Sequence, residues 1–503
     1  METHQPLSRH EALSLLAGAE LDVLVVGGGI VGAGIARDAA LRGLHTGLVE
    51  QHDFAYGTSS RSSRLLHGGL RYLAQGRIGL VREAGTEKGI VQRIAPHVSE
   101  PLAFLFPTYQ AMPWGQWPLW KLAVGVRIYD LLAGIRNGAR RSSSLGSARM
   151  RGLLSELNAE RLTGGVRYFD GLTNDARLVI DTLRSAAKAG ASVANYTRLI
   201  HSERVSGVWE CIVRDEVAGK EIAARAKCVV NATGPWADGL KHSSVRLRPT
   251  KGVHLVIARD RLPVPEAVVM IAGSRILFAI PWGERVILGT TDTDYEGRPE
   301  DVAAEDPDVD YILSVVNSAF PAAELSGRDV ISAWAGLRPL IAARNGGPSD
   351  ISRSHEIRTP EPGWWDVAGG KLTTYRLMAE QTVDRIQAYV GRKSECVTAS
   401  QPLLDPDETD GISAIVPPDP SRALVEHFCA REWSVHLEDV MLRRGGWTHY
   451  HADDDAVAAR VADWMASALG WSEDARSREL DRYIRSAERY ARVPAPAVTN
   501  GGA

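Results

Sequence analysis

Three glycines and one glutamate have the types and the spacing of a dinucleotide-binding turn. Gly27, Gly29 and Gly32 form G-x-G-x-x-G, and Glu50 follows about twenty residues downstream, where such turns place a ribose-binding acid. Because glycine has no Cβ, the turn can be tight and a phosphate oxygen can approach its backbone closely. A carboxylate at position 50 can accept a hydrogen bond from a ribose hydroxyl, which favours FAD or NAD over NADP.

The flanking sequence predicts the elements that position these residues. The apolar run Leu21–Val26 is typical of a buried strand, and the helix after the glycines would offer free N–H groups and a positive dipole end to a pyrophosphate. Arg42 and Gly43 close that helix, and the run HTGLV forms a second strand that ends beside Glu50. We therefore expect an α/β fold with a Rossmann-type domain. A tight turn that binds nothing is the alternative.

Composition limits the class of protein. The 503 residues, 44% of them hydrophobic, are enough for two or three packed domains. The net charge of -3 gives no indication of a nucleic-acid partner. None of the 4 cysteines lies in a C-x-x-C pair, so no metal site is predicted and a reduced, cytoplasmic protein is expected. Residues 1–20, read as an N-terminal extension, lack the basic head and apolar core of a secretory signal.

Five further stretches of the sequence, outside the glycine turn, are informative about function. They are GTSSRSSRLLHGGLRYL, NATGPW, GTTDTDYEG, AGLRPL and GGKLTTYR. Together with the turn they resemble the FAD-dependent glycerol-3-phosphate dehydrogenases, within the wider group of flavoproteins similar to D-amino-acid oxidase. The resemblance runs from Leu21 to Tyr389 and thins in the C-terminal region. It implies FAD as the cofactor and oxidation of sn-glycerol 3-phosphate to dihydroxyacetone phosphate, with hydride transfer from C2 to flavin N5.

The resemblance implies a set of FAD-contacting residues in separated parts of the chain. In GGKLTT, the two glycines would let the backbone pass close to the flavin ring. The helix that follows would direct N–H groups at the side of the ring that becomes negative on reduction. An ordinary Gly-Gly turn before a helix is the alternative. The implied residues are Gly27, Gly29, Gly32, Glu50, Thr58, Ser59, Ser60, Arg64, Leu66, His67, Gly69, Gly234, Gly370, Lys371, Leu372 and Thr373.

The resemblance also implies residues that bind the phosphate of the substrate. A guanidinium suits this role because its planar fork of donors matches two oxygens at once. A surface ion pair is the alternative for each arginine. The implied residues are Arg71, Tyr72, Arg338 and Arg353.

Four residues are candidates for the chemistry itself. The resemblance places His254 and His67 near the flavin, and a histidine can exchange protons near neutral pH. A satisfied core histidine is the alternative for His254. Lys371 or Arg338 would polarise the substrate oxygen or balance the charge of the reduced flavin. One departure from the family pattern bears on His254: Val253 stands before it, where the family often has serine.

The recurrence of the cofactor motifs predicts the domain organisation. Within residues 21–400 the FAD-binding domain would be discontinuous, with segments near 21–100, 170–245 and 330–392. A mixed-sheet substrate domain would be inserted near 100–170 and 245–330. A Pro/Asp-rich linker at 401–420 would precede an all-helical domain at 421–495 and a disordered tail at 496–503.

Three local patterns predict secondary structure outside the glycine turn. Asn174–Leu199 favours a helix followed by a strand, because its apolar residues recur with helical spacing. Asp453–Asp455 suits the positive N-terminal end of a helix, and Gly470 suits its end. The serine-rich stretch around Ser143 is interpreted as a flexible connection.

The resemblance also bears on the electron acceptor and on the location of the protein. We expect a quinone, with a glycerol-3-phosphate oxidase using O2, a same-fold flavin oxidase of an amino acid or amine, or a non-catalytic flavin-binding protein as alternatives. Two stretches are candidates for peripheral contact with the inner face of the plasma membrane. They are Met112–Gly134, with Trp114, Trp117, Trp120 and Tyr129 at the lipid headgroups, and the stripe Leu480–Ala487. Packing on the protein's own core is the alternative for both, and a homodimer is left open.

Overall fold

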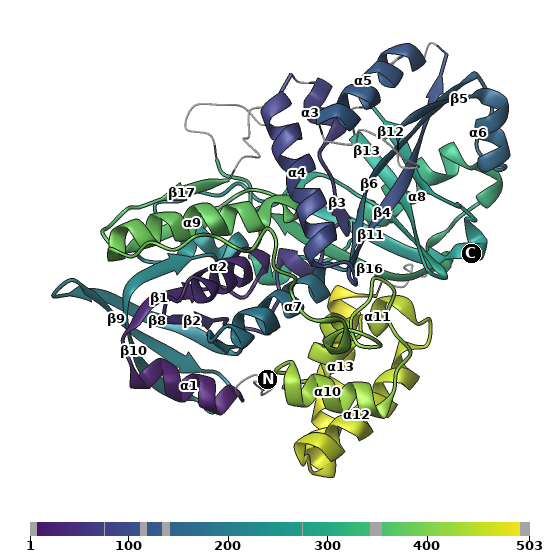
Figure 1. The fold of residues 1–503 in the computed structure, drawn as a ribbon. Helices are drawn as coiled ribbons and strands as arrows, with labels where there is room; N and C mark the ends of the chain where they lie inside the picture. The colour runs from purple at the N-terminus through teal and green to yellow at the C-terminus, as the bar shows by residue number, and fades with distance from the viewer. Residues whose placement is uncertain are drawn as a thin grey trace.

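The computed structural model describes residues 8–74, 76–110, 118–132, 141–273, 275–342 and 355–492. Two β-sheets and a C-terminal group of helices make up this part of the chain (Figure 1). None of its helices combines the length and the apolar content needed to cross a bilayer. Trp114, Trp117, Arg353 and the predicted tail at 496–503 lie outside the described residues.

The first sheet carries the glycine turn. Its strand β1 (Leu21–Val26) runs parallel to its neighbours β2 and β10, and all six of its residues are buried. The strand order is β17-β18-β10-β1-β2-β7, and the β8–β9 hairpin continues from β10. The other strands are β2 (Thr46–Val49), β7 (Ser192–Ala194), β8 (Thr197–Val205), β9 (Val208–Asp215), β10 (Lys220–Asn231), β17 (Glu356–Arg358) and β18 (Trp364–Ala368).

Helices cover both faces of the first sheet, which explains why β1 is apolar at every position but one. Val23 and Val25 pack in the cluster that contains α2 (Ile30–Leu41), α7 (Asp175–Lys188) and α9 (Tyr375–Val390). Leu24 and Val26 point to the opposite face, as alternation along a strand requires, and pack with α1 (Arg9–Gly18). Figure 1 shows α2 and α9 on one side of the sheet and α1 on the other.

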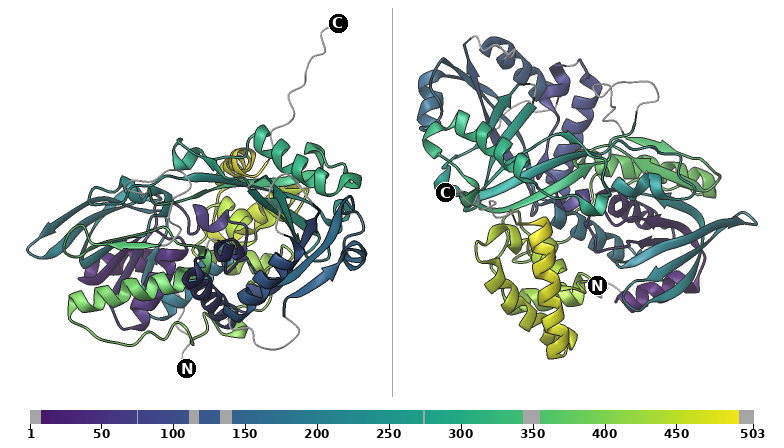
Figure 2. Two further views of the ribbon diagram at one scale, coloured as in Figure 1. Left: turned by 90° about the horizontal axis from the view of Figure 1, so that it is seen from above. Right: turned by 180° about the vertical axis from the view of Figure 1, so that it is seen from behind.

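The second sheet has ten strands and lies beside the first (Figure 2). Its order is β15-β11-β14-β13-β12-β4-β6-β3, with β16 paired to β11 and β5 to β6. The strands are β3 (Leu65–Leu66), β4 (Ser99–Tyr109), β5 (Ser143–Gly146), β6 (Leu162–Thr173), β11 (Thr250–Ala258), β12 (Ala267–Ala272), β13 (Arg275–Trp282), β14 (Arg285–Gly289), β15 (Thr293–Asp294) and β16 (Val330–Arg338). The helices associated with it are α3 (Leu70–Ala74), α4 (Ile78–Ile94), α5 (Leu119–Leu132), α6 (Ser147–Leu153) and α8 (Asp306–Ala319).

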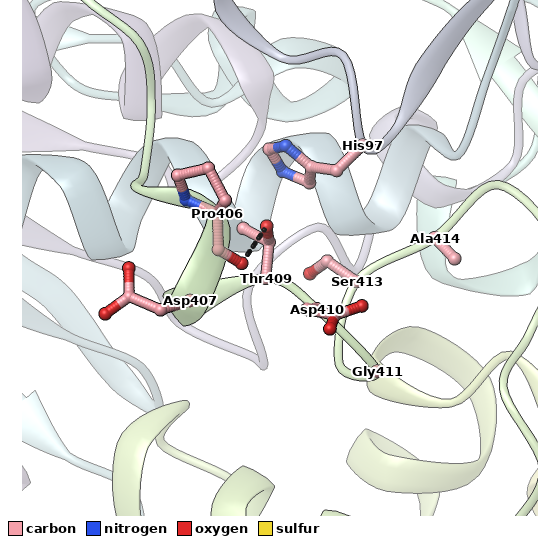
Figure 3. Close-up of a pocket in the computed structure, with 8 residues that line it drawn as sticks. All are labelled: His97, Pro406, Asp407, Thr409, Asp410, Gly411, Ser413 and Ala414. Carbon is pink, nitrogen blue, oxygen red and sulfur yellow. Dashed lines mark hydrogen bonds between the residues drawn. The ribbon is translucent and has the colours of Figure 1, made fainter.

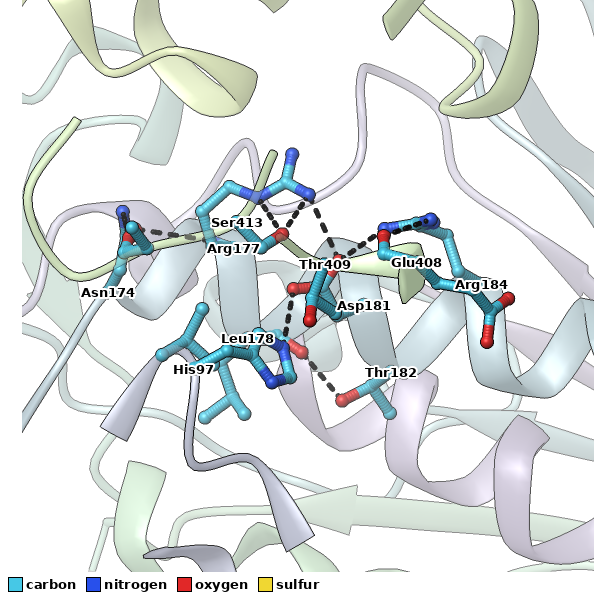
Figure 4. A network of polar contacts seen from close by, with 12 residues as sticks. His97, Asn174, Arg177, Leu178, Asp181, Thr182, Arg184, Glu408, Thr409 and Ser413 are labelled. Carbon is cyan, nitrogen blue, oxygen red and sulfur yellow. Dashed lines mark hydrogen bonds and ion pairs between the residues drawn. The ribbon is translucent and has the colours of Figure 1, made fainter. Parts of the chain in front are cut away.

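The C-terminal helices are α10 (Arg422–Arg431), α11 (Trp447–Tyr450), α12 (Asp454–Leu469) and α13 (Glu473–Tyr490). Buried ion pairs join them to the first sheet. Arg443 Nε lies 2.5 Å from Asp53 Oδ2, in the loop after β2. Arg177 of α7 donates from Nη1 to Glu432 Oε2 at 2.6 Å, and Figure 4 shows Arg177 with Asp181 in the same network. Removing one member of such a network would leave a buried charge unpaired.

Most local predictions are confirmed. The strand Leu21–Val26 is β1, the stretch after Asn174 forms α7 and then β7 and β8, and α12 ends at Gly470 in a left-handed conformation. The flexible connection at Ser143 was wrong. Residues 143–146 form β5 and 147–153 form α6, because Ser143 pairs with Arg167 on β6 and the chain is ordered by that neighbour.

The predicted α/β fold with a Rossmann-type sheet, a second mixed sheet and a helical C-terminal region is confirmed. The domain boundaries stay a prediction. Residues 330–338, which were assigned to a FAD-binding segment, form β16 of the second sheet, because they pair along β11. In the candidate stripe of α13, Tyr483 and Ala487 are buried in the C-terminal core. The expectation that Tyr129 lies at the lipid headgroups was wrong, because its ring is buried in the core of the second sheet.

Candidate functional site

The turn between β1 and α2 leaves no room for side chains at its glycines. Gly27 has a φ of +114°, and a Cβ on it would lie 2.5 Å from the carbonyl oxygen of Ala232. A Cβ on Gly32 would lie 1.9 Å from the carbonyl oxygen of Gly27. Gly29, which caps α2, has no side chain to satisfy the free N–H groups of the first turn. Apart from the N–H of Ile30, which Ser59 accepts, the N–H groups of this first turn point toward the site of an anionic group.

Glu50 lies at the end of β2, beside this turn. It accepts hydrogen bonds from the backbone N–H groups of Gly28, at 2.7 Å, and of His52, at 2.9 Å. Burial raises the pKa of Glu50, and these two donors oppose that rise by stabilising the carboxylate. The acid that the spacing predicted is thus held against the glycine turn by main-chain donors.

A polar segment at residues 58–64 connects the turn to the second sheet. Ser59 Oγ accepts the N–H of Ile30, the first residue of α2, at 3.0 Å. Thr58 Oγ1 donates to the carbonyl oxygen of Leu337 on β16 at 2.6 Å. Ser60 completes the short 3-10 turn that begins at Thr58. The same segment therefore contacts both the cofactor turn and the second sheet.

The Gly-Gly stretch after β18 forms the next wall of the site. Gly369 and Gly370 have φ values of +75° and +77°, a region that favours glycine. After Lys371 and Leu372, the buried Thr373 accepts the N–H of His67 with its hydroxyl at 3.0 Å. This hydrogen bond brings together two predicted cofactor-binding stretches. One is residues 66–69, which begins with Leu66 of β3, and the other is residues 370–373.

Lys371 and Tyr72 lie together next to this wall. The Lys371 Nζ is 3.8 Å from the centroid of the Tyr72 ring, a cation–π contact. Gly69, with a φ of +81°, allows this packing, because a Cβ there would lie 2.2 Å from the Tyr72 ring. Arg71 lies on α3 between Leu70 and Tyr72, but its side chain is outside the described part of the structure.

Arg338 ends β16 with its guanidinium held at several points. Nη1 lies 3.1 Å from Asp292 Oδ1, and Nη2 donates to Thr290 Oγ1 at 3.1 Å. The guanidinium packs over Gly252 of β11, where a Cβ would lie 2.6 Å from Nη2. The head group is therefore positioned by Gly252 of β11 and by the connection between β14 and β15, with 27% of the side chain exposed.

His254 lies on the face of β11 that also carries Gly252, and it pairs in register with Trp334 of β16. Its ring stacks on that of Trp334, with centroids 5.3 Å apart, and its Nε2 lies 2.7 Å from Ser63 Oγ. Burial, followed by repulsion from Arg338 and Arg64, lowers the pKa of His254 to about 3. The imidazole is therefore neutral at physiological pH and a weak base.

The guanidinium of Arg64 packs against two tryptophan rings of the second sheet. Its guanidinium lies 4.2 Å from the ring centroid of Trp282 and 5.1 Å from that of Trp334. Its Nε is 3.8 Å from Asp175 Oδ1. Because the side chain is buried there, any contact of Arg64 with a cofactor is expected from its backbone.

Several residues that shape the site were not predicted. Ser63 and Trp334 hold His254, and Asp292 holds Arg338. Ser63 and Asp292 each lie inside a quoted motif, GTSSRSSRLLHGGLRYL and GTTDTDYEG, but nothing in the spacing indicates their partners. Gly234, by contrast, was predicted as a cofactor residue. It follows β10 with a φ of +57°, two residues after Ala232, whose carbonyl lies against Gly27 of the glycine turn.

A separate pocket of about 460 Å³ lies beside His97 and the linker after residue 405 (Figure 3). Asp407 and Asp410 line it, and none of its lining residues is a predicted site residue. Its carboxylates do not suit an anionic substrate.

The observed cradle fits FAD. The glycine turn gives close main-chain approach, Gly29 offers no side chain to cap α2, and the 66–69 and 370–373 stretches meet through the hydrogen bond between His67 and Thr373. The chain matches the family of FAD dependent oxidoreductases called DAO over residues 22–385 and belongs to that family.

Two known relatives and one solved structure are similar to most of the chain. The chain is 35% identical to glycerol-3-phosphate dehydrogenase 2 of Mycobacterium tuberculosis, over 96% of this chain and 91% of the relative. It is 38% identical to alpha-glycerophosphate oxidase of Streptococcus pyogenes, over 74% of this chain and 71% of the relative. The structure of glycerol-3-phosphate dehydrogenase from Bacillus halodurans complexed with FAD superimposes with a TM-score of 0.78 at 28% identity, covering 97% of this chain and 98% of that one. The predicted family resemblance and the FAD assignment are confirmed.

Proposed function

We propose that this protein oxidises sn-glycerol 3-phosphate to dihydroxyacetone phosphate with FAD. The observation that carries the proposal is the position of the Arg338 guanidinium, which is held over Gly252 of β11 and donates to Thr290. The neighbouring residue Leu337 accepts a hydrogen bond from Thr58, in the segment that also contacts the cofactor turn. A positioned guanidinium suits a phosphate ester. The names of the two relatives and of the superimposed structure support the same substrate.

The chain's own residues would divide the work. Arg338, with Arg71, Tyr72 and Arg353 as further proposed donors, would bind the phosphate. The ammonium of Lys371 would stabilise negative charge near the reacting carbon. When bound, FAD supplies the acceptor for the hydride that leaves substrate C2.

The proton acceptor stays a prediction shared by His254 and His67. The neutral imidazole of His254 can accept a proton, but Arg338 and Arg64 disfavour the imidazolium that would result. Substituting His254→Gln keeps a hydrogen-bonding group near Ser63 and removes the titratable ring. If His254 is the base, kcat falls steeply with this variant while the FAD content is retained; if it positions Ser63 and Trp334, kcat changes little.

Arg338→Ala tests the proposal most specifically among the substitutions. We expect FAD to be retained and kcat/KM for glycerol 3-phosphate to fall by about 30-fold or more, because removing one partner of a hydrogen-bonded charge pair costs roughly 2–5 kcal/mol. Arg338→Lys keeps the charge but loses the fork, so an intermediate loss is expected. Arg248→Ala is the matched control, because Arg248 pairs with Asp294 at an exposed edge of the same sheet. Equal kinetics for Arg338→Ala and Arg248→Ala would exclude the phosphate role.

We further propose a quinone as the electron acceptor, with peripheral contact at a membrane. The relatives carry both dehydrogenase and oxidase names, so O2 is the second candidate. Reduction of the purified protein with substrate, followed by reoxidation with air or with a soluble quinone, distinguishes them. Faster reoxidation by quinone supports the dehydrogenase, and rapid reoxidation by air with release of hydrogen peroxide supports the oxidase.

A further inference from the structure

A buried tyrosine, aspartate and lysine meet beside residues 67–72, the segment that joins β3 to α3. Tyr129 of α5, Asp170 of β6 and Lys88 of α4 are all buried. Lys88 Nζ lies 2.8 Å from Asp170 Oδ1, and the Tyr129 hydroxyl donates to the same oxygen at 2.5 Å. Helices α4 and α5 both pack against β6, and Figure 1 shows them together with α3. We call these three residues the Tyr129 triad.

The triad holds one main-chain group, the N–H of Gly68. This N–H donates to the Tyr129 oxygen at 2.7 Å. A phenol has one hydrogen, and Asp170 accepts it, so the lone pairs of the Tyr129 oxygen are left to face Gly68. Burial raises the pKa of Tyr129 well above its usual value of 10, and the charge of Asp170 acts in the same direction. The direction of both hydrogen bonds is therefore fixed at physiological pH.

The contact between Tyr129 and the main chain requires a glycine at position 68. A Cβ on Gly68 would lie 2.5 Å from the Tyr129 oxygen. A larger residue would separate the N–H from the phenol or displace the helix that carries Tyr129. The bare main chain of Gly68 is therefore matched to the triad.

Neighbouring residues of the segment are held as well. The Thr373 hydroxyl accepts the N–H of His67 at 3.0 Å and donates to the carbonyl oxygen of His67 at 3.3 Å. Gly69 packs against the ring of Tyr72, and its carbonyl oxygen accepts the N–H of Tyr72 at 2.8 Å. Thr373 and the triad are thus two separate clamps on consecutive peptide groups, directly before α3 begins.

A buried ion pair is not needed to stabilise this part of the core. Desolvation of Lys88 and Asp170 costs free energy that their attraction offsets only in part, and apolar side chains of similar volume often stabilise such a site equally well. The charged pair instead supplies direction. Asp170 accepts from Lys88 and from Tyr129, and in this way it orients the phenol oxygen toward Gly68. A device that fixes one peptide group, next to proposed substrate-binding residues, indicates a role in positioning.

We propose that the Tyr129 triad positions the segment 67–72 for the oxidation of glycerol 3-phosphate. The inference rests on the proposed function, in which Arg71 and Tyr72 bind the phosphate and His67 is a candidate proton acceptor. Tyr129, Asp170 and Lys88 are positioning residues, because they act through the main chain and not on the substrate. Without them the segment would lose one of its two main-chain clamps, and the groups of α3 would no longer be held in place.

Tyr129→Phe removes the acceptor of the Gly68 N–H and keeps the aromatic ring. We expect FAD to be retained and kcat/KM for glycerol 3-phosphate to fall by about 10- to 100-fold, since a displacement of about 1 Å at a site can cost about 100-fold. Tyr168→Phe is the matched control. Tyr168 is buried in the same cluster, and its hydroxyl makes no hydrogen bond to another residue that the structure describes, so this variant should have the kinetics of the wild type.

The ion pair allows a rescue experiment. Lys88→Met leaves the buried carboxylate without its cation and should lower kcat/KM at least as much as Tyr129→Phe. Adding Asp170→Asn removes the unpaired charge and keeps an amide oxygen that can accept from Tyr129, so the double variant should recover about 10-fold in kcat/KM. Adding Tyr129→Phe as a third change should abolish that recovery. Equal kcat/KM for Lys88→Met and the double variant would overturn the proposal, whether or not Tyr129→Phe folds.

Hydrogen–deuterium exchange of the holoenzyme tests the clamp without relying on activity. Tyr129→Phe should speed the exchange of the peptide that contains residues 67–72 on the order of 10-fold, because a buried N–H loses its acceptor. Tyr168→Phe should leave this exchange unchanged. Equal exchange, or equal kcat/KM, in the two variants would overturn the proposal. A wild-type holoenzyme that does not oxidise glycerol 3-phosphate would instead refute the proposed function, while the exchange result would still decide whether the triad holds Gly68.

Discussion

Acidification should destabilise this protein through histidines that are buried without charge, and His449 allows the effect to be isolated. His449, on α11, lies with its Nδ1 2.7 Å from Ser332 Oγ of β16. Burial, followed by repulsion from Arg64 and Arg61, lowers its pKa from 6.5 to about 3. Asparagine at this position can keep the hydrogen bond to Ser332 and cannot titrate.

The sign and the size follow from proton linkage. The unfolded chain binds a proton at His449 below pH 6.5, whereas the folded chain does not until about pH 3. The contribution of the neutral His449 ring to the free energy of unfolding is therefore complete above pH 6.5, the pKa in the unfolded chain. It is lost as the pH falls from 6.5 toward about 3, the pKa in the folded chain. Each pH unit in that window costs about 1.4 kcal/mol, so acidification from about pH 7.5 to about pH 5 should cost roughly 2 kcal/mol through this residue.

Urea unfolding of the wild type and of His449→Asn, followed by circular dichroism at both pH values with FAD in excess, measures the difference. The variant is expected to be less stable than the wild type at the higher pH, and the gap should shrink by roughly 2 kcal/mol at the lower pH. His201→Asn, at a largely exposed histidine, should leave the pH dependence unchanged. A gap between wild type and His449→Asn that is independent of pH would refute the reasoning.

Three further substitutions test separate parts of the account. Gly32→Ala should abolish FAD binding, because its Cβ would overlap a carbonyl oxygen of the turn; protein that purifies with a full complement of FAD would contradict this. Asp53→Asn should lower the free energy of unfolding by about 3–5 kcal/mol, because the buried Arg444 would lose its carboxylate partner and the buried Arg443 would keep Asp439 but lose Asp53; a change below about 1 kcal/mol in urea unfolding would disprove it. Lys371→Met should retain FAD and lower kcat for glycerol 3-phosphate about 100-fold or more, since a charge that stabilises the reacting centre would be removed; unchanged kcat would exclude that role.

The cofactor turn could be predicted from the sequence because its determinants are local. The glycine spacing requires only that neighbouring backbone atoms approach closely, and Gly32 against Gly27 shows that approach. Glu50 follows the adjacent parallel strand, so its distance along the chain places it beside the turn. The end of α12 at Gly470 depends likewise on one residue's conformation.

The substrate side could not be predicted in the same way, because it depends on strand register between distant segments. His254 meets Trp334 because β11 and β16 pair across about eighty residues, and nothing local sets that pairing. Ser63 reaches His254 from a third segment. The stretch at Ser143 shows the opposite error, since pairing with β6 overrides a serine-rich sequence that favours a loop.

Anaerobic titration of the purified holoenzyme with glycerol 3-phosphate tests the central claim most directly. The yellow colour of the bound flavin should be lost as one equivalent of substrate is added, and Arg338→Ala should keep its colour under the same conditions. Glycerol without the phosphate, and amino acids such as glycine or proline, should leave the wild-type colour unchanged. A wild-type flavin that stays yellow with glycerol 3-phosphate but is bleached by an amino acid would contradict the account.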